Sequence, residues 1–132
     1  MTDIIKSKRN QLANTSNQYQ GSQPKILCLC SAGLLRSATI ADILVKSGKY
    51  NVRNAGCSQE YALIPLSTAL LEWADTIIVV KEWETFINSV LVEFYMTDEV
   101  NVISIDIPDE YSRNDPTLIN IITDALTKEG IL

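Results

Sequence analysis

A cysteine, an arginine and a serine stand close together in the first third of the chain, in the segment CSAGLLRS that runs from Cys30 to Ser37. An ionised cysteine is a nucleophile, and arginine presents a planar fork that binds two phosphate oxygens at once. Five residues separate Cys30 from Arg36. A loop of this length can turn several backbone N–H groups inward around an anion. The spacing therefore predicts a phosphate-binding loop with a nucleophilic sulfur at its base.

Each side chain of this loop has an expected task. The inward amides and the start of a following helix create a positive field, which favours the thiolate of Cys30 at neutral pH. A thiolate below a bound phosphoryl group is placed for in-line attack on phosphorus. Ser37 is expected to donate a hydrogen bond to the sulfur and to help it leave in a second step. The loop residues expected to bind phosphate beside Arg36 are Ser31, Ala32, Gly33, Leu34 and Leu35.

Composition excludes several other kinds of site. The sequence contains no histidine, which excludes Ser-His-Asp triads, Cys-His pairs and histidine metal sites. Its net charge of -5 has the wrong sign for a protein that neutralises many nucleic-acid phosphates. We therefore expect no metal, no other cofactor and no nucleic-acid partner. No apolar run approaches the roughly 20 residues of a membrane span, so no membrane partner is expected.

The cysteine count indicates the compartment. Three cysteines, Cys28, Cys30 and Cys57, are an odd number in a small chain and a poor disulfide framework. The N-terminal segment lacks the apolar stretch of a secretory signal. Both observations predict a reduced, cytoplasmic protein.

The elements that must position the loop alternate between strand and helix. Continuous apolar runs such as KILCLC and TIIVV are typical of strands that are covered on both faces. This alternation predicts a three-layer α/β/α fold with a four-stranded parallel sheet in the flavodoxin-like order 2-1-3-4. Ligands bind at the carboxyl ends of such strands, where the loop after the first strand lies. We expect strands at 25–30, 50–54, 76–80 and 100–105, and helices at 37–47, 65–73, 83–95 and 117–128.

The chain divides into two parts by composition. Residues 1–24 are polar and rich in Asn, Gln and Ser, which predicts a flexible leader that ends at Pro24. Residues 25–132 carry the strand and helix pattern and are long enough for one domain. We therefore expect a single α/β domain after the leader.

The segment KILCLCSAGLLRSATIADIL resembles the phosphate loop of the low-molecular-weight protein tyrosine phosphatases, and is most similar to their small bacterial and phage branch. The resemblance continues in the expected order through YNVRNAGCS, PLSTALLEWADTIIVV and IDIPDEYSRNDPTL. It implies that the domain at 25–132 is a cysteine-dependent phosphatase. Such an enzyme hydrolyses phosphotyrosine, in a protein, or a similar small aryl phosphate through a phosphocysteine intermediate.

The resemblance also implies roles for single residues. Cys30 matches the nucleophile, Arg36 the phosphate clamp and Ser37 the partner of the thiolate. Asp109, in the segment DIPDEY, falls where the family keeps its general acid, and Tyr111 falls where an aromatic residue lines the cleft. The chemistry needs such an acid, because a phenolate leaves best when a positioned carboxylic acid protonates it.

Two further aspartates, Asp106 and Asp115, share this loop and stay open as alternatives for the acid. Asp115 precedes Pro116 and the last helix, which is typical of a helix cap. The chain also departs from the family at Gly33, where the family usually has an asparagine that braces the loop. Glycine accepts the same left-handed backbone but offers no side-chain hydrogen bond.

Other functions fit parts of the pattern. The start of the loop, from Cys30 to Gly33, is similar to that of the sugar-transport phosphocarrier subunits in which a cysteine carries the phosphoryl group. Arg36 and the Asp109 segment argue against that reading. Arsenate reduction on the same fold requires two further cysteines, and only Cys57 lies downstream. A phosphate-binding relative with little turnover and a purely structural module are the remaining alternatives.

Overall fold

The computed structural model describes residues 22–62 and 64–132, so the predicted leader, apart from residues 22–24, lies outside the described residues. Four strands form one sheet, and every neighbouring pair is parallel. Their order is β2-β1-β3-β4, which confirms the order expected from the sequence. The strands are β1 (Lys25–Cys30), β2 (Asn51–Gly56), β3 (Thr76–Val80) and β4 (Asn101–Ile105).

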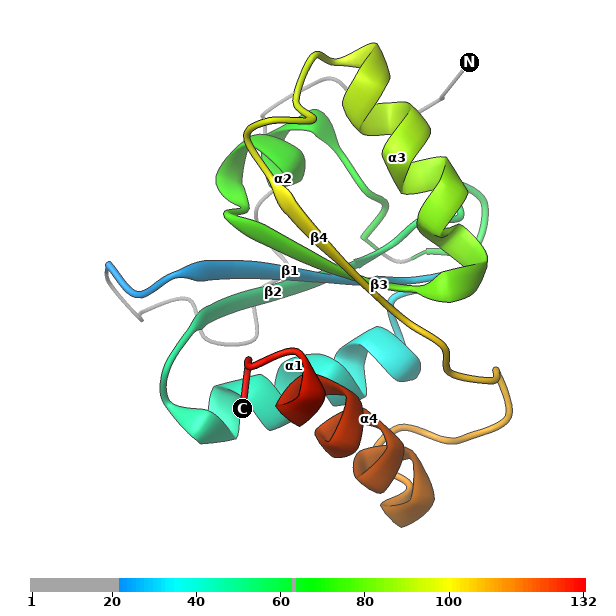
Figure 1. Cartoon of the computed structure of the whole chain (residues 1–132). Helices are drawn as coiled ribbons and strands as arrows, with labels where there is room; N and C mark the ends of the chain where they lie inside the picture. The colour runs from blue at the N-terminus through cyan, green and yellow to red at the C-terminus, as the bar shows by residue number, and fades with distance from the viewer. Residues whose placement is uncertain (1–21, 63) are drawn as a thin grey trace.

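Helices cover both faces of the sheet (Figure 1). On one face lie α1 (Arg36–Ser47) and α4 (Pro116–Lys128), and on the other lie α2 (Thr68–Trp73) and α3 (Glu84–Glu93). A short 3-10 helix, η1 (Lys81–Trp83), joins β3 to α3. Parallel strands are joined by crossovers, and the helices of these crossovers bury the apolar faces of the sheet. The architecture is the expected α/β/α arrangement of three layers.

The central strand β1 supplies side chains to a core on each face of the sheet, because successive side chains of a strand point to opposite faces. Leu27 and Leu29 pack with residues of α2 and α3. Ile26 and Cys28 pack with residues of α1 and α4. Each fully buried aliphatic side chain stabilises the fold by about 1.5–3 kcal/mol. Burial on both faces therefore fixes the path of β1 and the position of Cys30 at its end.

The third helix is shorter than the sequence pattern predicts. Instead of one helix over 83–95, Trp83 closes η1 and α3 spans Glu84–Glu93. The helix ends there because Tyr95 adopts a left-handed backbone with a φ of 57°. Across 22–62 and 64–132, no helix is long and apolar enough to cross a membrane.

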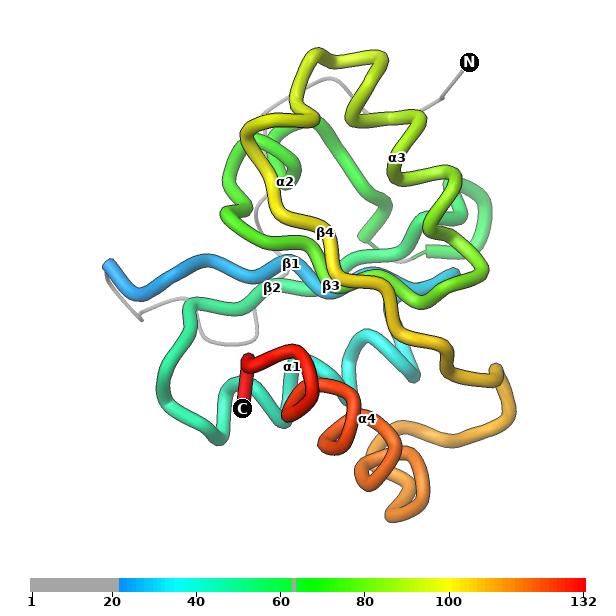
Figure 2. Tube along the Cα trace, in the orientation of Figure 1, coloured from blue at the N-terminus to red at the C-terminus, as the bar shows by residue number. Residues whose placement is uncertain are grey.

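The carboxyl ends of the strands meet at one edge of the sheet. The strand β2 extends to Gly56, two positions past its predicted end at residue 54, because it pairs with β1 as far as Cys30. Figure 2 shows the start of α1, the turn after β3 and the loop after β4 at this same edge. The fold therefore brings the loop after β1 next to the loop that carries Asp109.

Candidate active site

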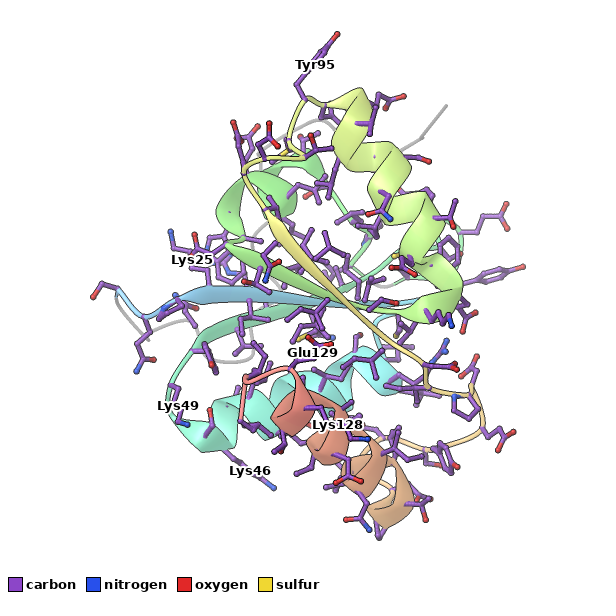
Figure 3. The ribbon with its side chains drawn as sticks, viewed as in Figure 1. Lys25, Lys46, Lys49, Tyr95, Lys128 and Glu129 are labelled. Atoms are coloured by element: carbon purple, nitrogen blue, oxygen red, sulfur yellow. The ribbon has the colours of Figure 1, made fainter. Side chains whose placement is uncertain are left out.

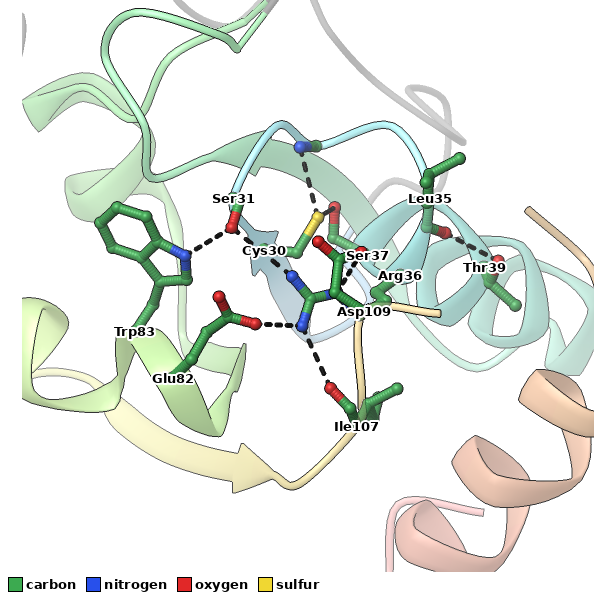
Figure 4. Close-up of polar contacts among 11 residues, drawn as sticks. Cys30, Ser31, Leu35, Arg36, Ser37, Thr39, Glu82, Trp83, Ile107 and Asp109 are labelled. Carbon is green, nitrogen blue, oxygen red and sulfur yellow. Dashed lines mark hydrogen bonds and ion pairs between the residues drawn. The ribbon is translucent and has the colours of Figure 1, made fainter. Parts of the chain in front are cut away.

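The loop after β1 closes into a small cup at the amino end of α1 (Figure 4). It spans residues 31–35, and α1 begins at Arg36. Leu35 at the N-cap position makes no side-chain capping bond, and the first turn of α1 contains no acidic residue. The first N–H groups of a helix have no partner within the helix and carry partial positive charge. The start of α1 is therefore suited to bind an anion.

Cys30 lies at the base of this cup, with 2% of its surface exposed. Its thiol donates to Ser37 Oγ at 3.2 Å and accepts a hydrogen bond from the backbone N–H of Gly33 at 3.3 Å. Ser37 comes from the first turn of α1 and Gly33 from the middle of the loop. The fold thus places a hydroxyl and a backbone donor within reach of the sulfur.

Gly33 is required by the shape of the loop. Its φ is 75°, and a Cβ there would lie 2.8 Å from the carbonyl carbon of Ala55 and 2.9 Å from the backbone nitrogen of Gly56. The loop therefore packs directly on the end of β2. Asn54, a buried residue of β2, donates from Nδ2 to the carbonyl oxygen of Gly33 at 2.7 Å. A side chain from the neighbouring strand thus braces the loop at the position where the family's own asparagine is missing.

Arg36 is almost completely buried, with 1% exposed, and its guanidinium contacts acceptors through all three nitrogens. Nη1 donates to the carbonyl oxygen of Ile107 at 3.1 Å and to the carboxylate of Glu82. Nη2 lies 3.5 Å from Ser31 Oγ, and Nε lies 3.6 Å from Asp109 Oδ1. Nη1 thus has two hydrogen-bond acceptors, whereas the contacts of Nε and Nη2 are 3.5 Å or longer. The edge formed by Nε and Nη2 can bind two phosphate oxygens in parallel.

A pocket of about 70 Å³ lies over the sulfur. A water molecule occupies roughly 30 Å³ of liquid. The pocket therefore has room for a small group such as a phosphoryl group. Leu35 in its lining is 41% exposed, and Leu34, the preceding residue of the loop, is 42% exposed. The residues that line it are Cys30, Ser31, Ala32, Leu35, Arg36 and Asp109.

Arg36 is the one cationic side chain among the described residues that line this pocket. Lys46, in the last turn of α1, and Lys49 lie toward the other end of the molecule (Figure 3). Two carboxylates, Glu82 and Asp109, contact the guanidinium. Positive charge at the pocket therefore comes from this one buried guanidinium and from the amides of the cup.

Asp109 reaches the pocket from the loop between β4 and α4, and 58% of its side chain is exposed. Asp115, an alternative for the acid, is instead the N-cap of α4 and accepts a hydrogen bond from the backbone N–H of Thr117 at 2.8 Å. Asp106 is exposed and does not line the pocket. Tyr111 is half-buried and packs on the core between the sheet, α1 and α4, outside the pocket lining. Of these four loop residues, the structure brings only Asp109 to Cys30 and Arg36.

The other two cysteines are buried on opposite faces of the sheet. Cys28 is 0% exposed and Cys57 is 2% exposed. Burial raises the pKa of both thiols well above the ordinary value of 9.0, and the neighbouring Cys30 acts in the same direction. Within the described residues, no three side chains of His, Cys, Asp or Glu gather as metal ligands would.

Three residues at the site have no counterpart in the sequence predictions. Glu82 and Trp83 come from η1, where Glu82 contacts Arg36 and the indole of Trp83 donates to Ser31 Oγ at 2.7 Å. Asn54 is the third. Asn54 did not stand out in the sequence, because it is one of three polar residues in the strand NVRNAG. No pattern in the sequence indicates that the turn after β3 points at the loop after β1.

No protein-family model matches the chain, and no curated protein matches it. Several solved structures, however, are similar to the chain. Wzb from Vibrio vulnificus, solved in complex with benzylphosphonate, has a TM-score of 0.61 at 19% identity, over 82% of this chain and 97% of Wzb. The tyrosine phosphatase AmsI from Erwinia amylovora has a TM-score of 0.60 at 16% identity, over 87% and 95% of the two chains.

A thioredoxin-dependent arsenate reductase from Corynebacterium glutamicum also matches, with a TM-score of 0.56 at 14% identity. The match covers 92% of this chain and 65% of the reductase. At these identities the similarity concerns the fold. The sheet order and the layers of this chain agree with these structures. The chain therefore has the fold of the low-molecular-weight tyrosine phosphatases, the family that its sequence resembles.

Proposed function

We propose that this protein is a phosphatase that hydrolyses phosphotyrosine, or a similar aryl phosphate monoester, through a phosphocysteine intermediate. The observation that carries the proposal is the convergence of the Cys30 sulfur, the Arg36 guanidinium and the Asp109 carboxyl group on one pocket of about 70 Å³. The fold that the chain shares with the tyrosine phosphatase AmsI supports the same conclusion.

In the first step, the amides of the cup and the Nε and Nη2 edge of Arg36 bind the non-bridging oxygens of the phosphoryl group. The thiolate of Cys30 then attacks phosphorus on the side opposite the leaving oxygen, so that an S–P bond forms while the P–O bond breaks. Asp109 gives its proton to the leaving oxygen, which departs as an alcohol.

In the second step, water attacks the phosphocysteine. Asp109, now a carboxylate, takes the proton of the water, and the S–P bond breaks to give inorganic phosphate and the free thiolate. The Ser37 hydroxyl is 3.2 Å from the sulfur. With Cys30 ionised, this hydroxyl donates to the sulfur and stabilises the charge that returns to it. Arg36 binds the phosphoryl oxygens in both steps.

The dimensions of the site support an aryl substrate. The pocket is small and Leu35 in its lining is exposed, so a substrate whose phosphoryl group lies over Cys30 extends past this apolar side chain. An aromatic ring buries apolar area against such side chains, whereas a sugar or a polyol would leave polar groups facing them. We therefore propose phosphotyrosine in a protein, or a small aryl phosphate, as the substrate class.

The buried cysteines favour hydrolysis over arsenate reduction, the activity in the name of one structural neighbour. A relay of disulfides needs thiols that reach Cys30 and the solvent, whereas Cys28 and Cys57 are 0% and 2% exposed. A sugar phosphocarrier is disfavoured by Arg36 and Asp109, which such a carrier does not require. A phosphate-binding relative with little turnover predicts the same pocket, so a kinetic test must separate it from a phosphatase.

Hydrolysis of p-nitrophenyl phosphate by the wild-type protein and by Cys30→Ser tests the proposal, with Cys28→Ser as the matched control. The wild type and Cys28→Ser should release p-nitrophenol, vanadate should inhibit both, and Cys30→Ser should be inactive. Equal rates for Cys30→Ser and the wild type would refute the proposal. Binding of phosphate without turnover in the wild type would identify the low-turnover relative.

A further inference from the structure

The turn after β3 reaches the phosphate loop with two consecutive side chains. Because β1 and β3 are parallel neighbours, η1 follows β3 at the edge of the sheet where the loop follows β1. Glu82 contacts Arg36, and Trp83 contacts Ser31 (Figure 4). The indole of Trp83 carries no net charge. Any effect of Trp83 on anion binding therefore comes from how it orients Ser31, and not from net charge.

The indole of Trp83 is held in place on several sides. It is half-buried and packs against the cores on both faces of the sheet. Its ring also meets the ring of Phe86 edge to face, with centroids 5.3 Å apart and planes at 85°. Such a pair favours one ring orientation. The indole N–H is therefore a fixed donor, and it is directed at Ser31 Oγ at 2.7 Å.

Ser31 lines the pocket and is the residue directly after Cys30. A hydroxyl group offers two acceptor positions and one donor. Trp83 Nε1 occupies one acceptor position, and Arg36 Nη2, at 3.5 Å, approaches the other. Both neighbours are donors only. The hydrogen of the Ser31 hydroxyl is therefore left to donate to an acceptor elsewhere, and the pocket that Ser31 lines is where a bound oxyanion would supply one.

We propose that the Ser31 side chain is an oxyanion-binding group of this site and that Trp83 is the positioning residue that turns its O–H into the pocket. The inference rests on the proposed function, because it assigns a further donor to the same phosphoryl group. The Ser31 hydroxyl adds a side-chain hydrogen bond to the phosphoryl oxygens, beside those from the cup amides and Arg36. A hydrogen bond to a charged group is among the stronger ones in proteins.

Binding of inorganic phosphate to the wild type, Ser31→Ala, Ser31→Thr, Trp83→Phe and the double variant Ser31→Ala/Trp83→Phe tests the inference by calorimetry. Ser31→Ala and Trp83→Phe should each raise the dissociation constant about ten-fold. Ser31→Thr retains the hydroxyl and should bind like the wild type. The double variant should be no weaker than Ser31→Ala, because Trp83 acts through the Ser31 hydroxyl.

The second tryptophan of the chain provides the matched control. Trp73 lies in α2, away from the pocket, with the Arg53 guanidinium 4.7 Å from its ring centroid. Trp73→Phe should leave phosphate binding unchanged. In that variant Trp83 is the only tryptophan, so phosphate should change its fluorescence.

Three outcomes would overturn the inference: Ser31→Ala binding phosphate as tightly as the wild type, Trp83→Phe weakening binding further in the Ser31→Ala background, or fluorescence that phosphate does not alter. Ser31→Ala alone decides the role of the hydroxyl if Trp83→Phe fails to fold. A wild type that binds no phosphate and hydrolyses no p-nitrophenyl phosphate would instead refute the proposed function.

Discussion

Arg113 in the loop after β4 and Asp42 in α1 form an ion pair with two hydrogen bonds, Arg113 Nε to Asp42 Oδ2 and Nη2 to Oδ1, both 3.0 Å long. A second connection lies beside it, because the backbone N–H of Asn114 donates to Thr39 Oγ1 at 2.9 Å and that hydroxyl donates to the carbonyl oxygen of Leu35 at 2.8 Å. The helix α1 thus holds the loop of the proposed acid and the end of the phosphate loop together.

Asp42→Asn should loosen the acid loop and leave the phosphate cup intact. Since Arg113 is 53% exposed, the pair should contribute less than about 1 kcal/mol to folding. Loss of the ion pair should slow the hydrolysis of phenyl phosphate more than that of p-nitrophenyl phosphate. The phenolate of phenyl phosphate is the poorer leaving group and depends more on protonation by the acid. The ratio of the two kcat/KM values, which covers only the steps up to release of the phenol, measures this effect, and Asp124→Asn, at an exposed position of α4, is the control. Equal slowing of both substrates in Asp42→Asn would contradict the link.

Asp109→Asn should change the same ratio in the same direction and by more. A positioned general acid accelerates a reaction by roughly 10²–10⁴-fold, and an activated phenolate leaves without its help. The kcat/KM for phenyl phosphate should therefore fall much further than the kcat/KM for p-nitrophenyl phosphate. Asp106→Asn serves as the control, because Asp106 does not line the pocket. A larger effect of Asp106→Asn than of Asp109→Asn would mean that the acid is misassigned.

Gly33→Ala and Gly48→Ala separate backbone strain from steric overlap. Both glycines have positive φ angles, 75° and 72°, but a Cβ at Gly48 would meet nothing within 4 Å. Gly48→Ala should therefore cost about 1–2 kcal/mol from its left-handed backbone alone. Gly33→Ala should cost more and should abolish phosphate binding, because its Cβ would collide with the backbone of β2. Urea unfolding and phosphate titration measure the two effects. Equal unfolding free energies for the two variants would contradict the close packing of the loop on β2.

The buried thiols of Cys28 and Cys57 predict a loss of stability at alkaline pH. Burial raises the pKa of each in the folded protein above its ordinary value of 9.0. Above that pH the unfolded chain releases these protons while the folded protein keeps them, so the free energy of unfolding decreases as pH rises. Each thiol contributes a slope that approaches about 1.4 kcal/mol per pH unit. Urea unfolding over roughly pH 9–11 should show a shallower slope in Cys57→Ala than in the wild type. An identical slope would mean that Cys57 ionises as readily in the folded protein as in the unfolded chain.

The sequence predicted the sheet well because its signals are local. The strands β1 and β3 have the predicted bounds, since each is a continuous apolar run that ends at a polar residue or a turn. The third helix was predicted less well, because the sequence from Trp83 to Tyr95 has helical spacing while the left-handed backbone of Tyr95 and the turn at η1 depend on tertiary packing. Local pattern thus fixes element type more securely than element ends.

At the site, the loop from Cys30 to Ser37 was readable because its residues are consecutive. Asp109 was predicted as the acid from the resemblance alone, and the fold places it in the lining of the pocket. Trp83 and Asn54 were missed, because their contacts with Ser31 and Gly33 join residues 52 and 21 positions apart. Such contacts depend on which strands are neighbours and on the direction of a turn.

Trapping of the covalent intermediate tests the central claim most directly. The wild-type protein is mixed with p-nitrophenyl phosphate, quenched in acid within one turnover and digested with trypsin, which releases the peptide ILCLCSAGLLR. Tandem mass spectrometry should place one phosphoryl group on Cys30 and none on Cys28, and Asp109→Asn should accumulate the same species. Product release with no phosphoryl group on Cys30, or with the group on Cys28, would contradict the account.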